Sequence, residues 1–463
     1  MKVYNNDTIA AISTAVGEGA IGIVRLSGER AVEIASKILR QNNKTSLSDR
    51  RSHSIFLASV VDPEDGSLVD EVLVSIMRAP NTYTREDIVE INCHGGAVAL
   101  RKTLGLALAA GARIADPGEF TKRAFLNGRI DLTQAEAVID AIRSRTDAAL
   151  KAAINQLEGG LSRDIGDIAE DIANVLTQIE AAVDFSDEDI ETLPKQHLIE
   201  TLRGAVNKID RLVRTAVRGR ILKEGVKTAI IGRPNVGKSS LLNALLRRER
   251  AIVTPVPGTT RDIIEEMVNV RGIPLILTDT AGIRDSNDEV ERIGIEFSRK
   301  AIKAADIIIC VLDASQEICD EDLALISEIG RDTAVLVLNK TDLPQKISRE
   351  NLQLPGNFKA VVKVSAISGA GVEALEEEIE KILLDGSVGI AGSTIITNAR
   401  HEQLLEMALG HVREATALIE ADQPEEIVST VLKESLDCLA EITGEAIGDD
   451  ILGRIFSQFC IGK

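Results

Sequence analysis

The sequence predicts a multidomain protein that begins with an α+β N-terminal domain. An all-α helical domain follows in the chain, and an α/β domain with a mainly parallel sheet is inserted into it. Short strand-like and helix-like segments mix in residues 1 to about 120. Apolar residues then recur at three- and four-residue steps typical of helices, first from about 131 and again after Gly392. Between these helical stretches, strands alternate with helices from Val226 to about Leu384.

Insertion is the simplest explanation, because a helical tail of this size would otherwise have to find a core elsewhere. We place the boundaries at 1–120, 121–220, 221–385 and 386–463, with the second and fourth segments forming the helical domain. The chain has 463 residues, enough for about three domains.

Composition limits the partners and the compartment. Asp and Glu number 72 against 53 Lys and Arg, a net charge of -19, which disfavours non-specific binding of nucleic acid. The cysteines form no C-x-x-C pair, which favours a reducing cytoplasm. No apolar run approaches the about 18–20 residues of a membrane span, and the start does not resemble a secretion leader. The five cysteines are Cys93, Cys310, Cys319, Cys438 and Cys460.

In the first domain, β-like apolar runs alternate with helix-like runs and are punctuated by Gly and Pro. This pattern predicts an α+β arrangement. The expected strands are 21–26, 69–77 and 88–92, and the expected helices are 31–39 and 97–110.

The helical domain is predicted from one long apolar stripe, which we expect to be core or a surface for a partner helix. The acidic stretch 184–191 and Pro194 interrupt it, and a further helix is expected over 197–217. The stripe consists of Leu150, Ala153, Ile154, Leu157, Leu161, Ile165, Ile168, Ile172, Val175, Leu176 and Ile179.

A phosphate-binding loop is predicted at 232–239, which reads GRPNVGKS, fits G-x-x-x-x-G-K-[ST] and follows the apolar run 228–231. The glycines allow backbone N–H groups to surround a β-phosphate. Lys238 supplies a charge for the β and γ oxygens, and Ser239 offers its hydroxyl to Mg²⁺ at the start of a helix.

Three later segments predict that the bound nucleotide is GTP. The DTAG segment places Asp279 to hold Mg²⁺ through water and Gly282 beside the γ-phosphate. The carboxylate of Asp342 can accept from guanine N1–H and the 2-amino group, a pairing that adenine cannot offer. The SA segment supplies backbone contact to the base edge. These segments, in the order that a guanine-nucleotide switch needs, are DTAG at 279–282, NKTD at 339–342 and SA at 365–366.

The usual water-orienting residue is absent, because Ile283 stands where Ras-like enzymes have glutamine. Thr259 and Thr260 occupy the switch segment, where a threonine closes on Mg²⁺ when the γ-phosphate is present. For hydrolysis, Asn235 could ligate a monovalent cation, and several downstream residues could orient water. From the residues alone, a solvated face explains the acidic ones better than a catalytic role does. The downstream candidates are Arg284, Asp285, Asp288, Glu289 and Glu291.

Along its whole length the chain resembles the bacterial tRNA-modification GTPase family MnmE, also called TrmE. The start, Asp7-Thr8-Ile9-Ala10 with 22–28 (GIVRLSG), is similar to the family's folate-binding domain. The end, 460–463 (CIGK), is similar to its Cys-x-Gly-Lys terminus. The resemblance implies an N-terminal domain that binds a tetrahydrofolate one-carbon carrier, 5-formyl or 5,10-methylene, and mediates homodimerisation.

The resemblance also implies GTP hydrolysis that depends on K⁺ and on pairing of two G domains across the dimer. The implied partner is MnmG, which alone carries FAD, in a heterotetramer. Together they would build an aminomethyl-type group on C5 of the wobble uridine of certain tRNAs.

Site residues follow from matching motifs. Asn235 would bind K⁺, with Thr254, Val256 and Thr259 of the loop 254–259, while Ser239 and Thr260 would ligate Mg²⁺. Glu291 matches the family's catalytic glutamate, which would orient the attacking water through a second water. The GTP-binding set is Asn235, Val236, Gly237, Lys238, Ser239, Ser240, Asp279, Thr280, Ala281, Gly282, Asn339, Lys340, Asp342, Ser365 and Ala366.

For the folate, the family's binding positions fall on Arg25, Glu90, Arg129 and Lys463. A carboxylate can pair with a pterin N–H edge, and cations can meet the carboxylates of the glutamate tail. Position 129 is often lysine in relatives, so arginine keeps the charge and alters its geometry. Without the resemblance, Arg25 and Glu90 would be explained as a structural ion pair. Cys460 would either take part in the uridine chemistry or pack near the folate.

Alternatives remain at this point. A ribosome-assembly switch GTPase of the Era or Der kind shares the nucleotide motifs, but Der needs a second NKxD segment and Era an α/β RNA-binding tail, whereas 393–459 reads as helix. A ferrous-iron transporter GTPase needs membrane spans. A basic stretch could touch tRNA phosphates or pair with neighbouring acids. It consists of Lys208, Arg211, Arg214, Arg218, Arg220, Lys223 and Lys227.

Overall fold

The computed structural model describes residues 7–15, 17–41, 46–184, 194–248, 266–277, 302–329, 333–347, 358–384 and 394–463. The described residues pack as two compact units. One unit joins the described residues up to 139 with those from 440 onward, and the other holds the described residues of 140–439.

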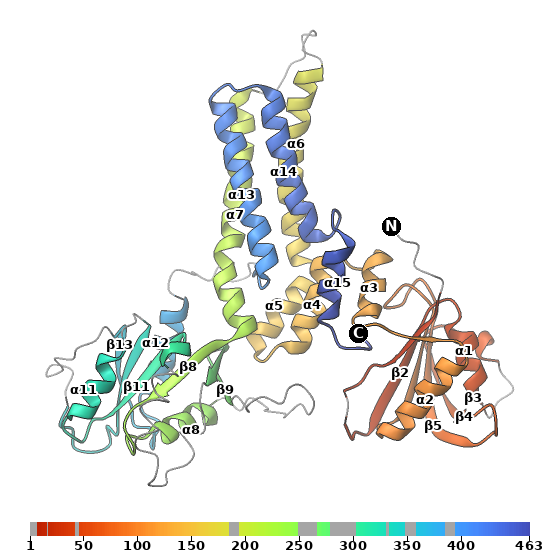
Figure 1. Ribbon diagram of the computed structural model, residues 1–463. Helices are drawn as coiled ribbons and strands as arrows, with labels where there is room; N and C mark the ends of the chain where they lie inside the picture. The colour runs from red at the N-terminus through yellow and green to blue at the C-terminus, as the bar shows by residue number, and fades with distance from the viewer. Residues whose placement is uncertain are drawn as a thin grey trace. The chain divides into compact units, whose positions relative to one another are not determined.

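The first unit is built on a seven-stranded sheet with the order β3-β4-β5-β6-β2-β1-β7 (Figure 1). Its neighbouring strands run antiparallel, except that β1 and β7 are parallel. The expected α+β arrangement is therefore confirmed. The strands are β1 (Ile9–Ile12), β2 (Ile21–Ser27), β3 (Leu39–Arg40), β4 (Ser54–Val61), β5 (Leu68–Met77), β6 (Ile88–His94) and β7 (Arg113–Ile114).

One face of this sheet is covered by α1 (Ala31–Ile38) and α2 (Ala97–Ala109). Because side chains alternate along a strand, Val24 and Leu26 of β2 point into this core together with Val89 and Ile91 of β6. Arg25 and Glu90, one residue along each strand, therefore stand on the opposite face, where they are direct cross-strand partners.

The end of the chain packs into the same unit. α15 (Asp449–Ser457) joins α3 (Glu119–Leu126) and the start of α4 (Leu132–Arg143) in one apolar cluster. Gly118, with a φ of 68°, lets the chain approach closely, since a Cβ atom there would lie 2.8 Å from the carbonyl oxygen of Phe456. Packing thus brings the last residues of the sequence to the N-terminal sheet.

Helices dominate the rest of the chain outside the inserted domain. Four long helices run side by side in Figure 1, and the buried hydroxyl of Ser435 donates to the carbonyl of Ala408 between two of them. Every helix among the described residues is too short or too polar to cross a lipid bilayer. The long helices are α6 (Gly160–Asp184), α7 (Lys195–Glu224), α13 (Ala399–Glu420) and α14 (Glu425–Thr443).

The long apolar stripe is interrupted near one end. The chain forms two helices, α5 (Asp147–Leu157) and α6, because Gly159 adopts a left-handed φ of 79° between them. This break resets the helical phase. Leu150 is 42% and Ile154 39% exposed, whereas the apolar residues of the stripe in α6 are buried as expected.

α7 is longer than the expected 197–217 and leads through Gly225 directly into β8 (Val226–Ile231). The chain returns to the helices near Thr397, whose hydroxyl donates to Asp140 at 3.0 Å. The side chain of Gln156 donates to the carbonyl of Ile395 at 2.7 Å. Segments before and after the α/β domain therefore pack on each other, which confirms that this domain is inserted.

The inserted domain has a six-stranded sheet with the order β13-β12-β11-β8-β10-β9. All neighbouring strands are parallel except β9 and β10, so the predicted mainly parallel sheet is confirmed. The remaining elements are α8 (Lys238–Arg248), β9 (Glu266–Val270), β10 (Ile273–Leu277), β11 (Ile307–Asp313), α11 (Asp320–Ser327), β12 (Ala334–Asn339), β13 (Ala360–Lys363) and α12 (Val372–Leu384).

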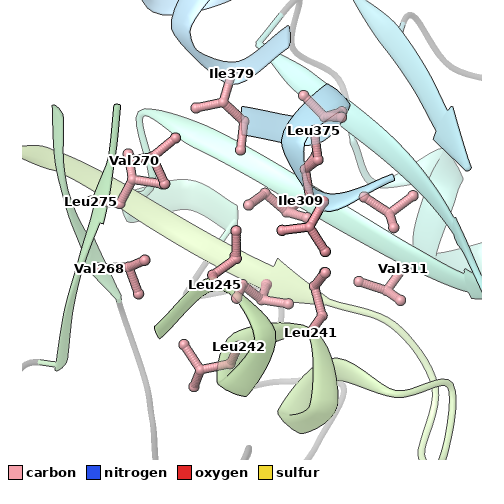
Figure 2. Close-up of a cluster of buried hydrophobic side chains, with 14 of the residues drawn as sticks. Leu241, Leu242, Leu245, Val268, Val270, Leu275, Ile309, Val311, Leu375 and Ile379 are labelled. Atoms are coloured by element: carbon pink, nitrogen blue, oxygen red, sulfur yellow. The ribbon is translucent and has the colours of Figure 1, made fainter. Parts of the chain in front are cut away.

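The main core of this domain lies between the sheet and the helices α8 and α12 (Figure 2). Leu241 and Leu245 of α8 approach Ile309 of β11 from one side, and Leu375 and Ile379 of α12 complete the cluster. Burial of these side chains fixes α8 against β8. As a result, the loop between β8 and α8 begins and ends on rigid elements.

Candidate functional site

The phosphate loop between β8 and α8 is shaped by three residues with left-handed backbone. Gly232 has a φ of 149°, Gly237 of 100° and Asn235 of 62°. A Cβ atom on Gly232 would lie 2.4 Å from the carbonyl oxygen of Val311, and one on Gly237 would lie 2.2 Å from Asn339 Nδ2. Glycine is therefore required at both ends of the loop.

Lys238 points back over this loop. Its Nζ donates to the carbonyl oxygens of Gly232 and Arg233, each at 2.8 Å. Burial lowers the pKa of the Lys238 ammonium. An anion beside Nζ would stabilise the charged form, so this ammonium suits a phosphate group.

Asn339, at the end of β12, ties two parts of the site together. Its buried Nδ2 donates to the carbonyl of Val236 at 2.9 Å, and its Oδ1 accepts from the backbone N–H of Ala366 at 3.0 Å. The phosphate loop and the predicted base-binding segment 365–366 are thus joined by one side chain.

Asp342 lies beside the predicted base-binding segment 365–366. Its Oδ1 accepts from the hydroxyl of Ser365 at 2.6 Å, which orients the carboxylate. The Nζ of Lys340 pairs with Asp313 Oδ2 at 2.7 Å. Burial opposes ionisation of Asp313, but hydrogen bonds from Lys340 and Ser315 hold its pKa below the ordinary value. Asn339, Lys340, Asp342, Ser365 and Ala366 therefore converge.

Other predicted residues of this site lie outside the described residues. They are Thr254, Val256, Thr259, Thr260, Asp279, Thr280, Ala281, Gly282 and Glu291. The described Ser239 and Ser240 are both exposed in the first turn of α8.

A second cluster lies on the face of the N-terminal sheet opposite to α1 and α2. Arg25 Nε donates to Glu90 Oε1 at 2.8 Å, and both side chains are about one-fifth exposed. The guanidinium of Arg25 also lies 5.5 Å from the ring centre of Phe120. The ion pair expected from the residues alone is present, and an aromatic ring lies against its arginine.

Tyr83 gathers further groups around this pair. The guanidinium of Arg129 lies over its ring, 4.8 Å from the centre. Its hydroxyl is 2.9 Å from the hydroxyl of Thr121. Burial raises the pKa of Tyr83, while Thr121 and the charges of Arg129 and Arg25 act in the opposite direction. Arg25, Glu90 and Arg129 therefore share one neighbourhood.

The C-terminal tail reaches this neighbourhood through its backbone. The N–H of Phe120 donates to the carbonyl of Lys463 at 3.1 Å. Gly462 has a φ of 96°, and a Cβ atom there would lie 2.3 Å from the carbonyl oxygen of Ile12. Lys463 is half-buried, whereas Cys460 is exposed. All four predicted folate residues thus lie around Phe120 and Tyr83.

The basic stretch on α7 is largely paired with acids. Lys208 pairs with Asp171, and Arg214 with Asp210. Further along, Arg220 pairs with Glu402 and Lys223 with Asp140. This favours the solvated, paired face over a surface reserved for phosphates.

Sequence reasoning missed the aromatic partners of the arginines. Phe120 and Tyr83 carry no motif of their own, but the sequence holds only eight Phe, two Tyr and no Trp. Scarcity of rings was the one signal available. The ion pair between Arg233 and Asp322 was missed because its members are 89 residues apart.

Two family models match the chain. The model described as "MnmE helical domain" matches residues 132–460, and the model described as "GTP-binding protein TrmE N-terminus" matches residues 8–129.

Curated relatives match over the full length. The tRNA modification GTPase MnmE of Alkaliphilus oremlandii is 48% identical over all of both chains. The same-named protein of Enterococcus faecalis is 50% identical over 99% of this chain and 98% of its own. Among solved structures, the G domain of the T. maritima FeoB iron transporter is 28% identical over 34% of this chain and 98% of its own, with a TM-score of 0.25.

Proposed function

The chain belongs to the MnmE family of tRNA modification GTPases, and from this premise we propose that it is a potassium-dependent GTP hydrolase acting on the tRNA wobble position. With an FAD-containing partner of the MnmG type, it would install an aminomethyl-type group on C5 of the wobble uridine of certain tRNAs. The one-carbon unit would come from a tetrahydrofolate derivative, 5-formyl or 5,10-methylene.

The observation that carries the proposal is the convergence of the phosphate loop, Asn339 and Asp342 at one end of the inserted sheet. Lys238 carries a desolvated ammonium that an anion would stabilise. Asp342 presents a carboxylate held by Ser365, which suits the donor edge of guanine. Ser239 at the start of α8 would hold Mg²⁺, and Thr260, which lies outside the described residues, would complete its ligands.

Potassium dependence can be tested directly. Asn235 is exposed with a φ of 62° in the phosphate loop, and it would bind K⁺ together with Thr254, Val256 and Thr259, which lie outside the described residues. We expect GTP turnover at equal ionic strength to be at least about tenfold faster in KCl than in NaCl. Asn235→Ala should remove this difference. Equal turnover of the unsubstituted chain in both salts would contradict the cation site.

Glu291 is proposed to orient the attacking water, because Ile283, which stands at the position of the Ras-like glutamine, has no polar group with which to do so. Glu291→Ala should collapse the turnover number and leave GTP affinity nearly unchanged. Glu289→Ala, two residues earlier in the same acidic segment, is the matched control and should retain turnover. A large loss of GTP affinity in Glu291→Ala would instead assign this residue a structural role.

Folate binding is proposed at Arg25, Glu90, Arg129 and Lys463. The cationic and anionic groups beside the rings of Phe120 and Tyr83 fit a flat pterin with a negatively charged tail. Titration with 5-formyltetrahydrofolate should show weaker binding for Arg25→Ala. Arg50→Ala is the matched control, because Arg50 also lies over a ring, that of Phe56, elsewhere in the unit. Identical binding by Arg25→Ala and the unsubstituted chain would refute the assignment.

The C-terminal tail is proposed to complete the folate site. Gly462→Ala would force a Cβ atom against the backbone of Ile12 and displace Lys463, so folate binding should weaken. Gly453→Ala in α15, where a Cβ atom would meet nothing, should bind as before. Cys460 is exposed and would contribute to the uridine chemistry or pack beside the folate.

The biological reaction would be tested by mass spectrometry of wobble uridines from cells that lack this protein. Loss of the C5 substituent is expected, and its retention would contradict the proposal. We further propose a cytoplasmic homodimer that forms a heterotetramer with the flavoenzyme. A ribosome-assembly GTPase of the Era kind is disfavoured, because every element among the described residues after 394 is a helix.

A further inference from the structure

Arg233, the second residue of the phosphate loop, forms an ion pair that the phosphate-loop motif does not specify, because position 233 is variable in G-x-x-x-x-G-K-[ST]. Its Nε donates to Asp322 Oδ1 at 2.7 Å. The side chain of Asp322 is only 4% exposed and that of Arg233 20%. Water screens such a pair less than an exposed one, so its loss leaves a carboxylate that is costly to bury alone.

Asp322 is itself anchored to the start of α11. Its Oδ2 accepts from the backbone N–H of Cys319 at 3.2 Å and from the thiol of the same residue at 3.5 Å. The carboxylate therefore uses one oxygen to cap its own helix and the other to hold Arg233. Through Asp322, Arg233 is tied to the first turn of α11.

The same residue also holds the loop lysine. The carbonyl oxygens of Arg233 and Gly232 both accept from Lys238 Nζ. Gly232 is pressed against β11, and Arg233 is tied to α11. The second half of the loop is held separately, by Asn339 at the carbonyl of Val236. Arg233 and Asp322 supply the matching attachment for the first half.

We propose that Arg233 and Asp322 are positioning residues of the nucleotide site, which hold the first half of the phosphate loop in its binding shape. This inference rests on the GTPase function proposed above. Lys238 and the loop N–H groups then meet the phosphates without rearrangement of the loop. When the pair is broken, bound nucleotide should leave faster, while the chemical step at saturating GTP should change little.

The test uses the full chain and a fluorescent GDP analogue, N-methylanthraniloyl-GDP, displaced by excess GDP. Dissociation rate, KM and kcat for GTP, and the melting temperature without nucleotide are measured. The variants are Arg233→Ala, Arg233→Lys, Asp322→Asn and the double variant Arg233→Ala with Asp322→Asn. Glu380→Gln is the matched control, because it breaks the ion pair with Arg271 in the same domain.

Arg233→Ala should release the analogue about tenfold faster and raise KM, with kcat within about twofold. The release rate of Arg233→Lys should lie between those of Arg233→Ala and the unsubstituted chain. The double variant should release the analogue no faster than the faster of the two single variants, and Glu380→Gln should release it at the unsubstituted rate. If Asp322→Asn unfolds, the test depends on Arg233→Ala, because this variant keeps the Asp322 carboxylate that caps α11.

Dissociation within twofold of the unsubstituted chain in Arg233→Ala would overturn the inference, as would additive effects in the double variant. A lowered melting temperature with unchanged dissociation would assign the pair a purely structural role. Failure of the unsubstituted chain to bind the analogue would overturn the proposed GTPase function as well.

Discussion

At the scale of single residues, buried polar side chains join segments that are far apart in the sequence. Arg123 is the clearest case, with its side chain only 4% exposed. Its guanidinium donates to the carboxylates of Asp7, Glu86 and Glu119. Each of these acids lies in a different local segment, so one arginine connects the start of the chain to α3.

Base recognition gives the first prediction at this scale. Asp342→Asn should weaken GTP binding about ten- to hundredfold, because the carboxylate that accepts two hydrogen bonds from guanine is replaced by an amide, whose NH₂ group cannot accept one. The same variant should bind xanthosine triphosphate more tightly, since xanthine presents an acceptor where guanine has its 2-amino group.

Competition against a fluorescent GDP analogue measures both affinities for Asp342→Asn. Ser365→Ala, which only removes the hydroxyl that orients the carboxylate, should lose less affinity and keep the preference for guanine. An unchanged preference in Asp342→Asn would show that this carboxylate does not read the base.

Acid stability gives a second prediction. Burial opposes ionisation of Glu119, but hydrogen bonds, chiefly from Arg113, hold its pKa below the ordinary value of 4.5. Such a carboxylate stabilises the fold above its unfolded-state pKa, and this stabilisation is lost as the pH falls through the folded-state pKa. The first unit should therefore lose stability below about pH 4.5.

Glu119→Gln tests this assignment. At pH 7 the free energy of unfolding should fall by about 3–5 kcal/mol, because Arg123 loses a buried partner. Its pH dependence between 5 and 3 should also become flatter. Urea unfolding followed by circular dichroism measures both, with the exposed Glu64→Gln as control. An unchanged slope would mean that other carboxylates govern acid unfolding.

At the scale of elements, close backbone approach decides how the helices pack. Gly219 lies buried in α7, and a Cβ atom there would be 1.8 Å from the carbonyl oxygen of Ile396. This is where the chain re-enters the helices after the inserted domain. A glycine at one position of a 30-residue helix thus allows the backbone at Ile396 to pack directly against α7.

Two glycines of the same helix make a matched pair. Gly204→Ala, where a Cβ atom meets nothing, should stabilise α7 by up to about 1 kcal/mol through helix propensity. Gly219→Ala should instead lower the free energy of unfolding, by about 1–3 kcal/mol, because the backbone of Ile396 must move. Urea unfolding measures both. Equal stabilisation by the two substitutions would contradict the packing at Gly219.

At the scale of the whole molecule, two compact units each have a core and a candidate ligand site of their own. The described nucleotide residues belong to the second unit, and Arg25, Glu90, Arg129 and Lys463 belong to the first. Each ligand should therefore stabilise mainly the unit that binds it.

Calorimetry of the full chain tests this separation. GDP at about a hundredfold excess over its dissociation constant should stabilise the second unit by about 2.7 kcal/mol. The melting temperature of the first unit should not change. 5-Formyltetrahydrofolate should instead raise the melting temperature of the first unit. If one transition responds to both ligands, the units unfold as a single body.

By itself, the sequence determined the fold class, the phosphate loop with its following helix, and the order of the nucleotide segments. These features depend on residues a few positions apart, so periodicity and motif spacing are sufficient to predict them. Periodicity did not predict the exposure of Leu150 and Ile154, because one left-handed glycine changed the phase of the stripe.

Only the tertiary structure decided which distant groups meet. The pairing of Arg25 with Glu90 depends on strand register, and the bond from Phe120 to Lys463 depends on how the tail packs. The contacts of Asn339 and Arg233 with other segments depend on the parallel order of the inserted sheet. Such contacts span many residues and arise only when the cores form, so no local pattern encodes them.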